Sequence, residues 1–419
     1  MKKIVLSLAG VLAATAFAPE AAAVPAFARQ VGMGCTACHA QHFPILNSFG
    51  QSFKAAGYTM MGAQGKVEGE HLSIPDTLNA SMVLKAMYQK ANGSDAAGTL
   101  SGETTNGGQW QIPDEFALLI GGRVAENIGF LFEGALPGTD FGIAAGFKMP
   151  FVFNVGAAQL SVIPYMTDGL GVAYGYELSS TGAVRNVRWS EHRKETSAAQ
   201  YTGIGGWAAT GLALVAKNDM GYINFSRWSP NFVAGGGASA IQLRSNYLRI
   251  AATPTVADWA MHIGAQLASG SNYQDGSGTL GLSGSFELIE TKASALDFQA
   301  LGQVGGNDLG VYATWSKANA TAAGATPNVF NTAARDKTAW TIAADYSVIP
   351  NALHLAAAYR NGDNGKATAN GDDAITLQAV YDLQQNVALH LIHSRYSGSA
   401  YDAAGKADTL TTFMLEAAW

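Results

Sequence analysis

The sequence predicts a mainly β fold, in which a transmembrane antiparallel β-barrel of about 16 strands follows a small N-terminal helical segment. The first observation is low charge: 13% of the 419 residues are charged and 49 are Gly, whereas ordinary soluble proteins have about 25% charged residues and about 7% Gly. The second is that no apolar run beyond residue 23 approaches the roughly 20 residues that cross a bilayer as a helix. The third is a long alternation of apolar with small or polar residues, which is typical of strands between lipid and a lumen.

The same composition excludes two classes of protein. Hydrophobic residues make up 48% of the chain and the formal net charge is -6, so the chain has ample apolar surface to bury and is not disordered. A nucleic-acid partner would require a basic stripe, which this mildly acidic chain lacks. We therefore expect a folded protein with no nucleic-acid partner.

Residues 1–23 have the pattern of a secretory signal peptide. Lys2 and Lys3 precede an apolar stretch over residues 4–18, and small residues at 21–23 form a cleavage site. A membrane anchor is the alternative, but the apolar stretch is short and is followed by Pro19 and Glu20. We predict that the chain is exported and that the mature protein begins at Val24.

Both cysteines of the chain lie in one motif, Cys35-Thr36-Ala37-Cys38-His39. C-x-x-C-H is the signature of covalent c-type haem attachment. Two thiols at this spacing can reach the two vinyl groups on one porphyrin edge, and the adjacent His then lies beneath the iron. We therefore predict one haem c bound to Cys35 and Cys38, with His39 as proximal metal ligand and catalytic residue. A disulfide and a zinc site are the alternatives, and zinc would need a fourth ligand.

The sequence leaves the sixth iron ligand open. Met60, Met61 and His71 are the downstream candidates, while His42 is close enough to His39 to belong to the proximal side. Met ligation would raise the reduction potential, whereas an open position would leave room for chemistry. Met60 and Met61 can equally be packing residues, because Met readily fills gaps in apolar cores.

We assign residues 24–75 to a monohaem cytochrome c segment and residues 76–419 to the barrel. A segment of about 50 residues is small for an independent domain, so we expect it to plug the barrel. Four apolar residues recur in it at helical spacing and are predicted to cover one haem face. They are Phe43, Leu46, Phe49 and Phe53.

Alternation is clearest over residues 259–267, 309–316 and 340–346. Such strands present one face to lipid and the other to a lumen, although a soluble β-sandwich also contains alternating strands. The closing strand runs from Phe413 to an aromatic terminus, Trp419, which is common in outer-membrane barrels. The residues predicted to face the lumen include Tyr247, Arg249, His262, Asp345, His354, Arg360, His390 and Glu416.

The connections between strands have two lengths. Short turns are predicted at residues 216–219, 305–308 and around 350–351, and long polar loops at 318–337 and 361–373. Short periplasmic turns and long external loops are typical of outer-membrane barrels. The barrel part has 344 residues (419 minus 75), and at roughly 21 residues per strand and connection this gives 16 strands, with 14 or 18 as alternatives. The number is even because both termini are expected in the periplasm.

The N-terminal residues resemble a known family. The run from Val24 to Gln30, the C-x-x-C-H motif, residues 43–50, Phe53-Lys54 and residues 57–59 resemble the haem segment of the fused cytochrome-porins of iron-oxidising bacteria. The resemblance covers about residues 24–59, and across the barrel it is one of length and architecture only. It implies an outer-membrane monohaem cytochrome, an oxidoreductase that takes an electron from extracellular Fe(II) and passes it through haem to a periplasmic cytochrome.

A single haem cannot conduct across about 25 Å of hydrocarbon unless it lies within the lumen. We therefore expect the haem segment to plug the barrel, with Fe(II) arriving from outside. Lumen imidazoles and carboxylates could hold Fe(II) transiently, although polar lining bonded to itself or to the plug is the commoner role. Loop carboxylates at Asp363, Asp372 and Asp373 are interpreted as solvated. The alternatives are another surface donor or acceptor, or a diffusion porin whose haem segment is a redox sensor or gate.

Overall fold

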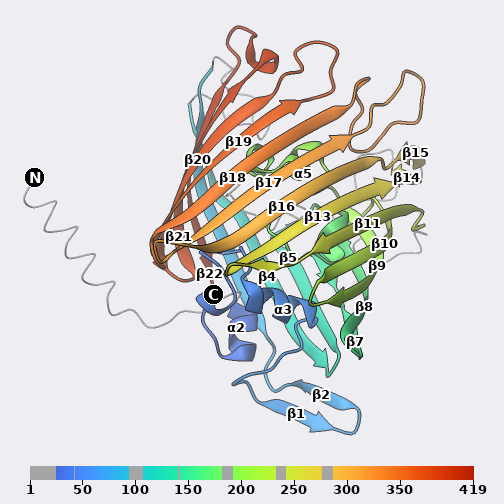
Figure 1. Cartoon of the computed structure of the whole chain (residues 1–419), viewed down its shortest axis with the longest axis vertical. Helices are drawn as coiled ribbons and strands as arrows, with labels where there is room; N and C mark the ends of the chain where they lie inside the picture. The colour runs from blue at the N-terminus through green and yellow to red at the C-terminus, as the bar shows by residue number, and fades with distance from the viewer. Residues whose placement is uncertain are drawn as a thin grey trace, which may run out of the picture.

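The chain forms a closed antiparallel barrel (Figure 1). The computed structural model describes residues 25–41, 43–93, 107–139, 142–181, 192–232, 242–275 and 286–419. The predicted signal peptide, Val24 and His42 lie outside these residues. Eighteen strand segments make the ring, but β6 and β7 both pair with β5 and β8, and β11 and β12 both pair with β13. Each of these two pairs is one interrupted strand, so the described ring has 16 strands (18 minus 2), as predicted.

The ring strands are joined in chain order, each to its neighbour, and β22 closes the ring by pairing with β3. Their bounds are β3 (Ala80–Ala91), β4 (Gln109–Ala125), β5 (Ile128–Thr139), β6 (Gly142–Lys148), β7 (Phe151–Val155), β8 (Ala158–Thr167), β9 (Ala209–Asn218), β10 (Gly221–Ser229), β11 (Ser245–Ala252), β12 (Thr255–Val256), β13 (Trp259–Ser269), β16 (Ala293–Val304), β17 (Asn307–Ala318), β18 (Lys337–Ile349), β19 (Leu353–Asp363), β20 (Asp373–Gln384), β21 (Val387–Ser397) and β22 (Thr409–Ala418).

The predicted alternation is confirmed by burial. All eight residues expected to face the lumen are buried, while large apolar side chains project outward from the same strands. Examples on the outer surface are Leu214, Ile223, Ile250, Leu296, Ile342, Leu377 and Leu391. In lipid, only a closed ring satisfies every strand edge, so this apolar outer surface identifies a membrane-spanning barrel. Within the described ranges, no helix is both long and apolar enough to cross a membrane.

The two ends of the barrel differ as predicted. At one end, residues 219–220, 305–306 and 350–352 make tight turns. The first two turns are shorter than predicted, because β9 continues to Asn218 and β17 already begins at Asn307. At the other end, residues 319–336 and 364–372 form long connections, the second closely matching the predicted loop. A hairpin of β14 (Ser271–Asp275) and β15 (Phe286–Glu290) extends this long-loop end.

The N-terminal segment contains three short helices and lies at the short-turn end (Figure 1). They are α2 (Pro25–Val31), η2 (Cys35–Ala37) and α3 (Ser48–Ala55). Hydrogen bonds join this segment to opposite sides of the ring: Gln51 Oε1 lies 3.0 Å from His262 Nε2 of β13, and the Cys35 N–H donates to Gln385 at 3.0 Å. The segment therefore lies inside the mouth of the barrel. The hairpin of β1 (Lys66–Gly69) and β2 (Leu72–Pro75) lies outside the ring (Figure 1).

A second segment, between β8 and β9, has described residues 168–181 and 192–208, and these fold into the lumen from the long-loop end. We call it the inner loop. It carries η3 (Val172–Gly175), α4 (Arg193–Thr196) and α5 (Ala198–Thr202). The Ala198 N–H donates to Thr314 Oγ1 of β17 at 2.7 Å, and His192 bonds Ser394 of β21 and Thr412 of β22. The inner loop thus crosses the barrel, and the sequence did not predict it.

Candidate functional site

The cysteine motif lies on a tight turn at the short-turn end of the barrel. The backbone N–H of His39 donates to the Cys35 carbonyl at 2.9 Å. Asn47 is the N-cap of α3, its Oδ1 accepting from the Gly50 N–H at 3.0 Å, and its Nδ2 donates to the Ala37 carbonyl at 3.1 Å. The residue that starts the helix therefore also holds the motif.

Close packing of α3 on the motif depends on Gly50. A Cβ at this position would lie 2.2 Å from the Cys38 carbonyl oxygen, closer than real Cβ contacts come. Any side chain here would push α3 away from the turn. The absence of a side chain thus determines the distance between helix and motif.

The His39 ring is oriented by a backbone carbonyl. Its Nδ1 lies 3.3 Å from the Ile45 oxygen, and the ring packs edge-on against Phe43 with centroids 5.4 Å apart. Because a carbonyl can only accept, this contact assigns the proton to Nδ1. The metal-binding lone pair is then on Nε2, as in most metal-ligating histidines.

Both cysteines are free thiols in this structure and are not bonded to each other. Burial raises the pKa of Cys35 to about 12 and also raises the pKa of Cys38. Burial thus favours the neutral thiol form of both side chains in the metal-free chain.

A cavity of about 210 Å³ opens beside Cys38 and His39, and we call it the His39 cavity. Its walls are largely apolar side chains from the N-terminal segment and from β4 and β5. They include Phe27, Phe43, Leu46, Phe53, Tyr58, Leu119 and Leu131. Three of the four residues predicted to cover a haem face line this cavity. The exception is Phe49, which is 36% exposed and is absent from the cavity wall.

Two lysines project into the His39 cavity. Lys148 of β6 is buried and donates to the Tyr174 carbonyl at 2.9 Å, and Lys54 of α3 is half-buried. Neither ammonium forms an ion pair among the residues that the structure describes, whereas Lys85, which is buried at 0% exposure, pairs with Glu115 of the same cavity. Burial lowers the pKa of Lys54 to about 8. The carboxylate of Glu133 of β5 also lines the cavity. The two ammonium groups, which form no ion pair within the described part of the chain, are the groups in this cavity that could bind an anion.

A second, much smaller cavity of about 60 Å³ lies on the other side of the motif, against β20–β22. Cys35, Thr36 and His39 line it together with Asp382 and Glu416. The motif therefore separates an acidic cavity from the apolar one. We call the acidic one the Cys35 cavity.

The candidates for a sixth ligand lie away from these cavities. The side chains of Met60 and Met61 are absent from both cavity walls, and Met60 packs against Val31, Phe53 and Tyr58. His71 is in the β1–β2 turn with a side chain 93% exposed. In this arrangement the structure supports the packing role of Met60 and brings none of the three to His39.

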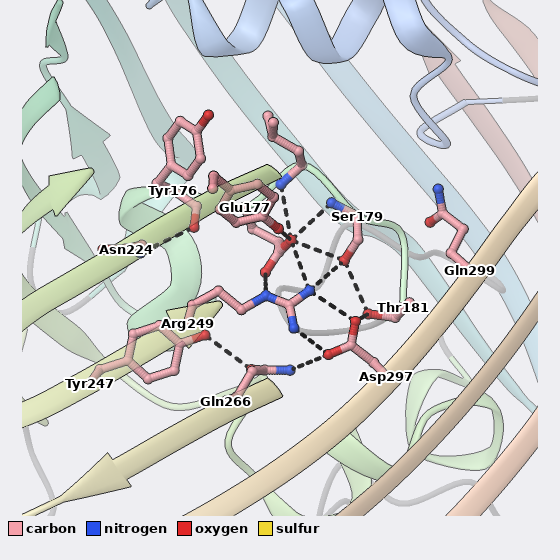
Figure 2. Close-up of polar contacts among 12 residues, drawn as sticks. Tyr176, Glu177, Ser179, Thr181, Asn224, Tyr247, Arg249, Gln266, Asp297 and Gln299 are labelled. Carbon is pink, nitrogen blue, oxygen red and sulfur yellow. Dashed lines mark hydrogen bonds and ion pairs between the residues drawn. The ribbon is translucent and has the colours of Figure 1, made fainter. Parts of the chain in front are cut away.

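The centre of the lumen holds a buried ionic network (Figure 2). The guanidinium of Arg249 bonds both oxygens of Asp297 and lies 2.9 Å from Glu177 Oε2, with all three side chains at 0% exposure. Glu177 belongs to the inner loop and also accepts from the Ser179 N–H at 2.8 Å and from Tyr222. This network holds the inner loop to the barrel wall.

The other predicted lumen residues are also bonded to the wall or to the inserted segments. His354 lies 3.0 Å from Asp382, His390 lies 3.4 Å from Glu416, and Arg360 pairs with Asp372. Of the three loop carboxylates interpreted as solvated, Asp372 is thus in an ion pair, and Asp363 and Asp373 accept hydrogen bonds within the loop. No group of three or more His, Cys, Asp or Glu that could hold a metal ion occurs among the described residues.

Sequence reasoning missed Lys148, Lys54 and Glu177. Lys148 lies in a short segment of a strand interrupted by Pro150, so no long alternation marks it. Glu177 lies in the inner loop, whose only signal is that 41 residues (168–208) separate β8 from β9, far more than an ordinary connection of about 4–6 residues.

Comparison with protein-family models and with curated protein sequences gives no match. Solved structures that resemble the chain include the following three. A loop-deletion mutant of OmpT from Vibrio cholerae is 12% identical with a TM-score of 0.45, over 82% of this chain and 99% of that one. OpdK from Pseudomonas aeruginosa is 10% identical with a TM-score of 0.42 (81% of this chain, 98% of that one), and a mutant porin of Rh. blastica is 12% identical with a TM-score of 0.48 (82% of this chain, 100% of that one). These similarities concern the fold alone.

The closed ring, the apolar outer surface and the short and long connections at opposite ends define the class of protein. It is an outer-membrane β-barrel of the porin type.

Proposed function

We propose that this protein is an outer-membrane c-type cytochrome-porin that oxidises extracellular Fe(II) and passes the electron through one covalent haem to a periplasmic cytochrome. The observation that carries the proposal is the opening of the C-x-x-C-H turn onto a largely apolar cavity that two lysines enter, neither of them in an ion pair among the described residues. Haem is a planar apolar group with two anionic propionates, so the residues present fit it. When bound, haem supplies one-electron chemistry at its iron.

The chain's own residues have distinct tasks in this proposal. Cys35 and Cys38 form the thioether bonds, and Nε2 of His39 is the iron ligand, oriented by the Ile45 carbonyl at 3.3 Å. The apolar wall of the His39 cavity excludes water. Lys54 and Lys148 offset the charge of the propionates, since opposite charges are favourable in a dry cavity.

Haem reduction by Fe(II) tests the proposal. Purified haem-loaded protein in detergent is mixed with Fe(II) without oxygen, and the haem absorbance is followed. We expect the spectrum to change to the ferrous form, as it does with dithionite, and the His39→Ala variant to lose this reaction while its barrel still assembles. Reduction by dithionite but not by Fe(II) would leave a haem protein with another donor or acceptor, and the iron assignment would be lost.

A diffusion porin with a haem sensor or gate is the second candidate, and the porin-type barrel with a loop folded into its lumen favours it. Swelling of liposomes that contain the protein distinguishes the two. We expect little uptake of small sugars, because the inner loop and the N-terminal segment both occupy the lumen. Fast uptake that changes with haem oxidation state would favour the gated porin.

A further inference from the structure

The outer part of the lumen has a cavity that the proposed function does not use. It measures about 500 Å³ and lies between the helices of the inner loop and the barrel wall, on the long-loop side. We call it the outer cavity. Its lining combines aromatic side chains, Tyr201, Trp207 and Phe330, with charged ones from α4 and β18.

The charged lining of the outer cavity is mainly cationic. Arg193, Lys194 and Lys337 face it together with one carboxylate, Glu195, which gives a net charge of +2 (three minus one). Neither Lys194 nor Lys337 forms an ion pair among the described residues, and the Glu195 carboxylate accepts from the Tyr396 hydroxyl at 3.0 Å. The Lys337 ammonium lies 4.8 Å from the centre of the Tyr201 ring. These cations would repel free Fe(II) and attract an anion.

Charge at the other end of the barrel has the opposite sign. The Cys35 cavity is lined by Asp382 and Glu416 and by no Lys or Arg. The positive charge is thus a local property of the outer cavity and not a general property of this mildly acidic chain, whose formal net charge is -6.

The outer cavity adjoins the His39 cavity through the start of the inner loop. Gly169 lines the outer cavity, and the next residue, Leu170, lines the His39 cavity. The Gly171 N–H donates to the carbonyl of Trp207, another outer-cavity residue, at 2.9 Å. The linings of the two cavities therefore adjoin at the start of the inner loop, so a molecule in the outer cavity would lie next to the wall of the His39 cavity.

We propose that the outer cavity binds a polycarboxylate anion and, resting on the proposed function, that Fe(II) is oxidised there as its anionic polycarboxylate complex rather than as the aquo ion. The complexed Fe(II) loses one electron and becomes Fe(III) in the same complex. The oxidant is the ferric haem iron, which gains that electron. No bond forms or breaks and no proton moves, and the Fe(III) leaves in soluble complexed form.

Citrate binding tests the site itself. Isothermal titration of the haem-loaded protein with citrate at low salt is compared between the unchanged chain, the double variant Lys194→Gln with Lys337→Gln, and the control Lys366→Gln. Lys366 is an exposed loop lysine at the same end that does not line the cavity. We expect the double variant to bind about tenfold more weakly and the control to be unchanged. No binding to the unchanged protein, or equal loss in the control, overturns the proposal.

Stopped-flow reduction then separates this proposal from the proposed function. Fe(II)–citrate is expected to reduce the haem faster than aquo Fe(II), and the double variant is expected to lose this advantage. Equal rates for the two donors would overturn the anionic-complex inference and leave the iron oxidase intact. If dithionite reduces the haem but neither iron donor does, the proposed iron oxidation is wrong. The calorimetry would still decide whether the outer cavity binds polycarboxylates.

Discussion

Arg249 at the centre of the lumen and Lys148 beside His39 are both buried cations, but their surroundings differ. Arg249 is enclosed by two carboxylates, Glu177 and Asp297. The Lys148 ammonium donates to a backbone carbonyl and is in no ion pair among the described residues. A cation that is fully paired within the chain is a structural element, whereas an unpaired one indicates a place for an anion that the chain itself does not supply.

The largest effect is expected from removing both cysteines. Cys35→Ser with Cys38→Ser eliminates the two thioether bonds, so haem that remains with the unfolded chain should fall to background. Haem staining after denaturing electrophoresis measures this, and heat-modified migration reports barrel assembly. Covalent haem in this variant would contradict the attachment site and would leave the unpaired lysines without an explanation.

Removing the central cation is expected to destabilise the barrel strongly. Arg249→Met leaves two buried carboxylates without a cationic partner, which costs about 3–5 kcal/mol. Thermal unfolding in detergent, followed by tryptophan fluorescence, measures the loss. If the variant unfolds like the unchanged protein, the network does not hold the inner loop.

The matching change beside His39 is Lys148→Met. We expect it to change the free energy of unfolding in opposite directions in the haem-free and the haem-loaded protein. In the haem-free cysteine variant, Lys148→Met removes an unpaired buried charge and should stabilise the barrel by about 1–2 kcal/mol. In the haem-loaded protein the same change removes a partner of a propionate and should destabilise it by about 1–3 kcal/mol. Lys85→Met, which breaks the pair with Glu115, should destabilise both forms. If Lys148→Met changes the stability in the same direction in both forms, this would argue against an anion at this position.

The smallest expected effect is a pH dependence from Lys54. Burial lowers its pKa from 10.5 to about 8 in the folded chain, so between these values the unfolded chain binds more protons. The stability of the haem-free protein should therefore rise as the pH increases from about 8 to 10.5. Unfolding at a series of pH values measures how the free energy of unfolding depends on pH. The Lys54→Met variant is the control, because it lacks the titrating group. A bound anion should flatten the slope by raising the pKa of Lys54.

Much of the barrel could be predicted because each strand repeats one simple pattern. His262 and Asp345 were assigned to the lumen from alternation alone, and both are buried. The contacts that position the motif were not predictable, because they join residues far apart in the chain, such as Gln51 with His262 and Cys35 with Gln385. The inner loop has no repeating pattern, so the ion pair from Glu177 to Arg249 could not be read from either residue.

Ring closure has a consequence for the order of assembly. The last strand pairs with the first strand of the ring, and Trp419 exchanges two backbone hydrogen bonds with Met82, at 2.8 and 3.1 Å. The N-terminal segment is thus enclosed by a ring that closes only when β22 pairs with β3. Cys35 and Cys38 are buried in the closed barrel, so under the proposed function we expect haem to be attached in the periplasm before the ring closes.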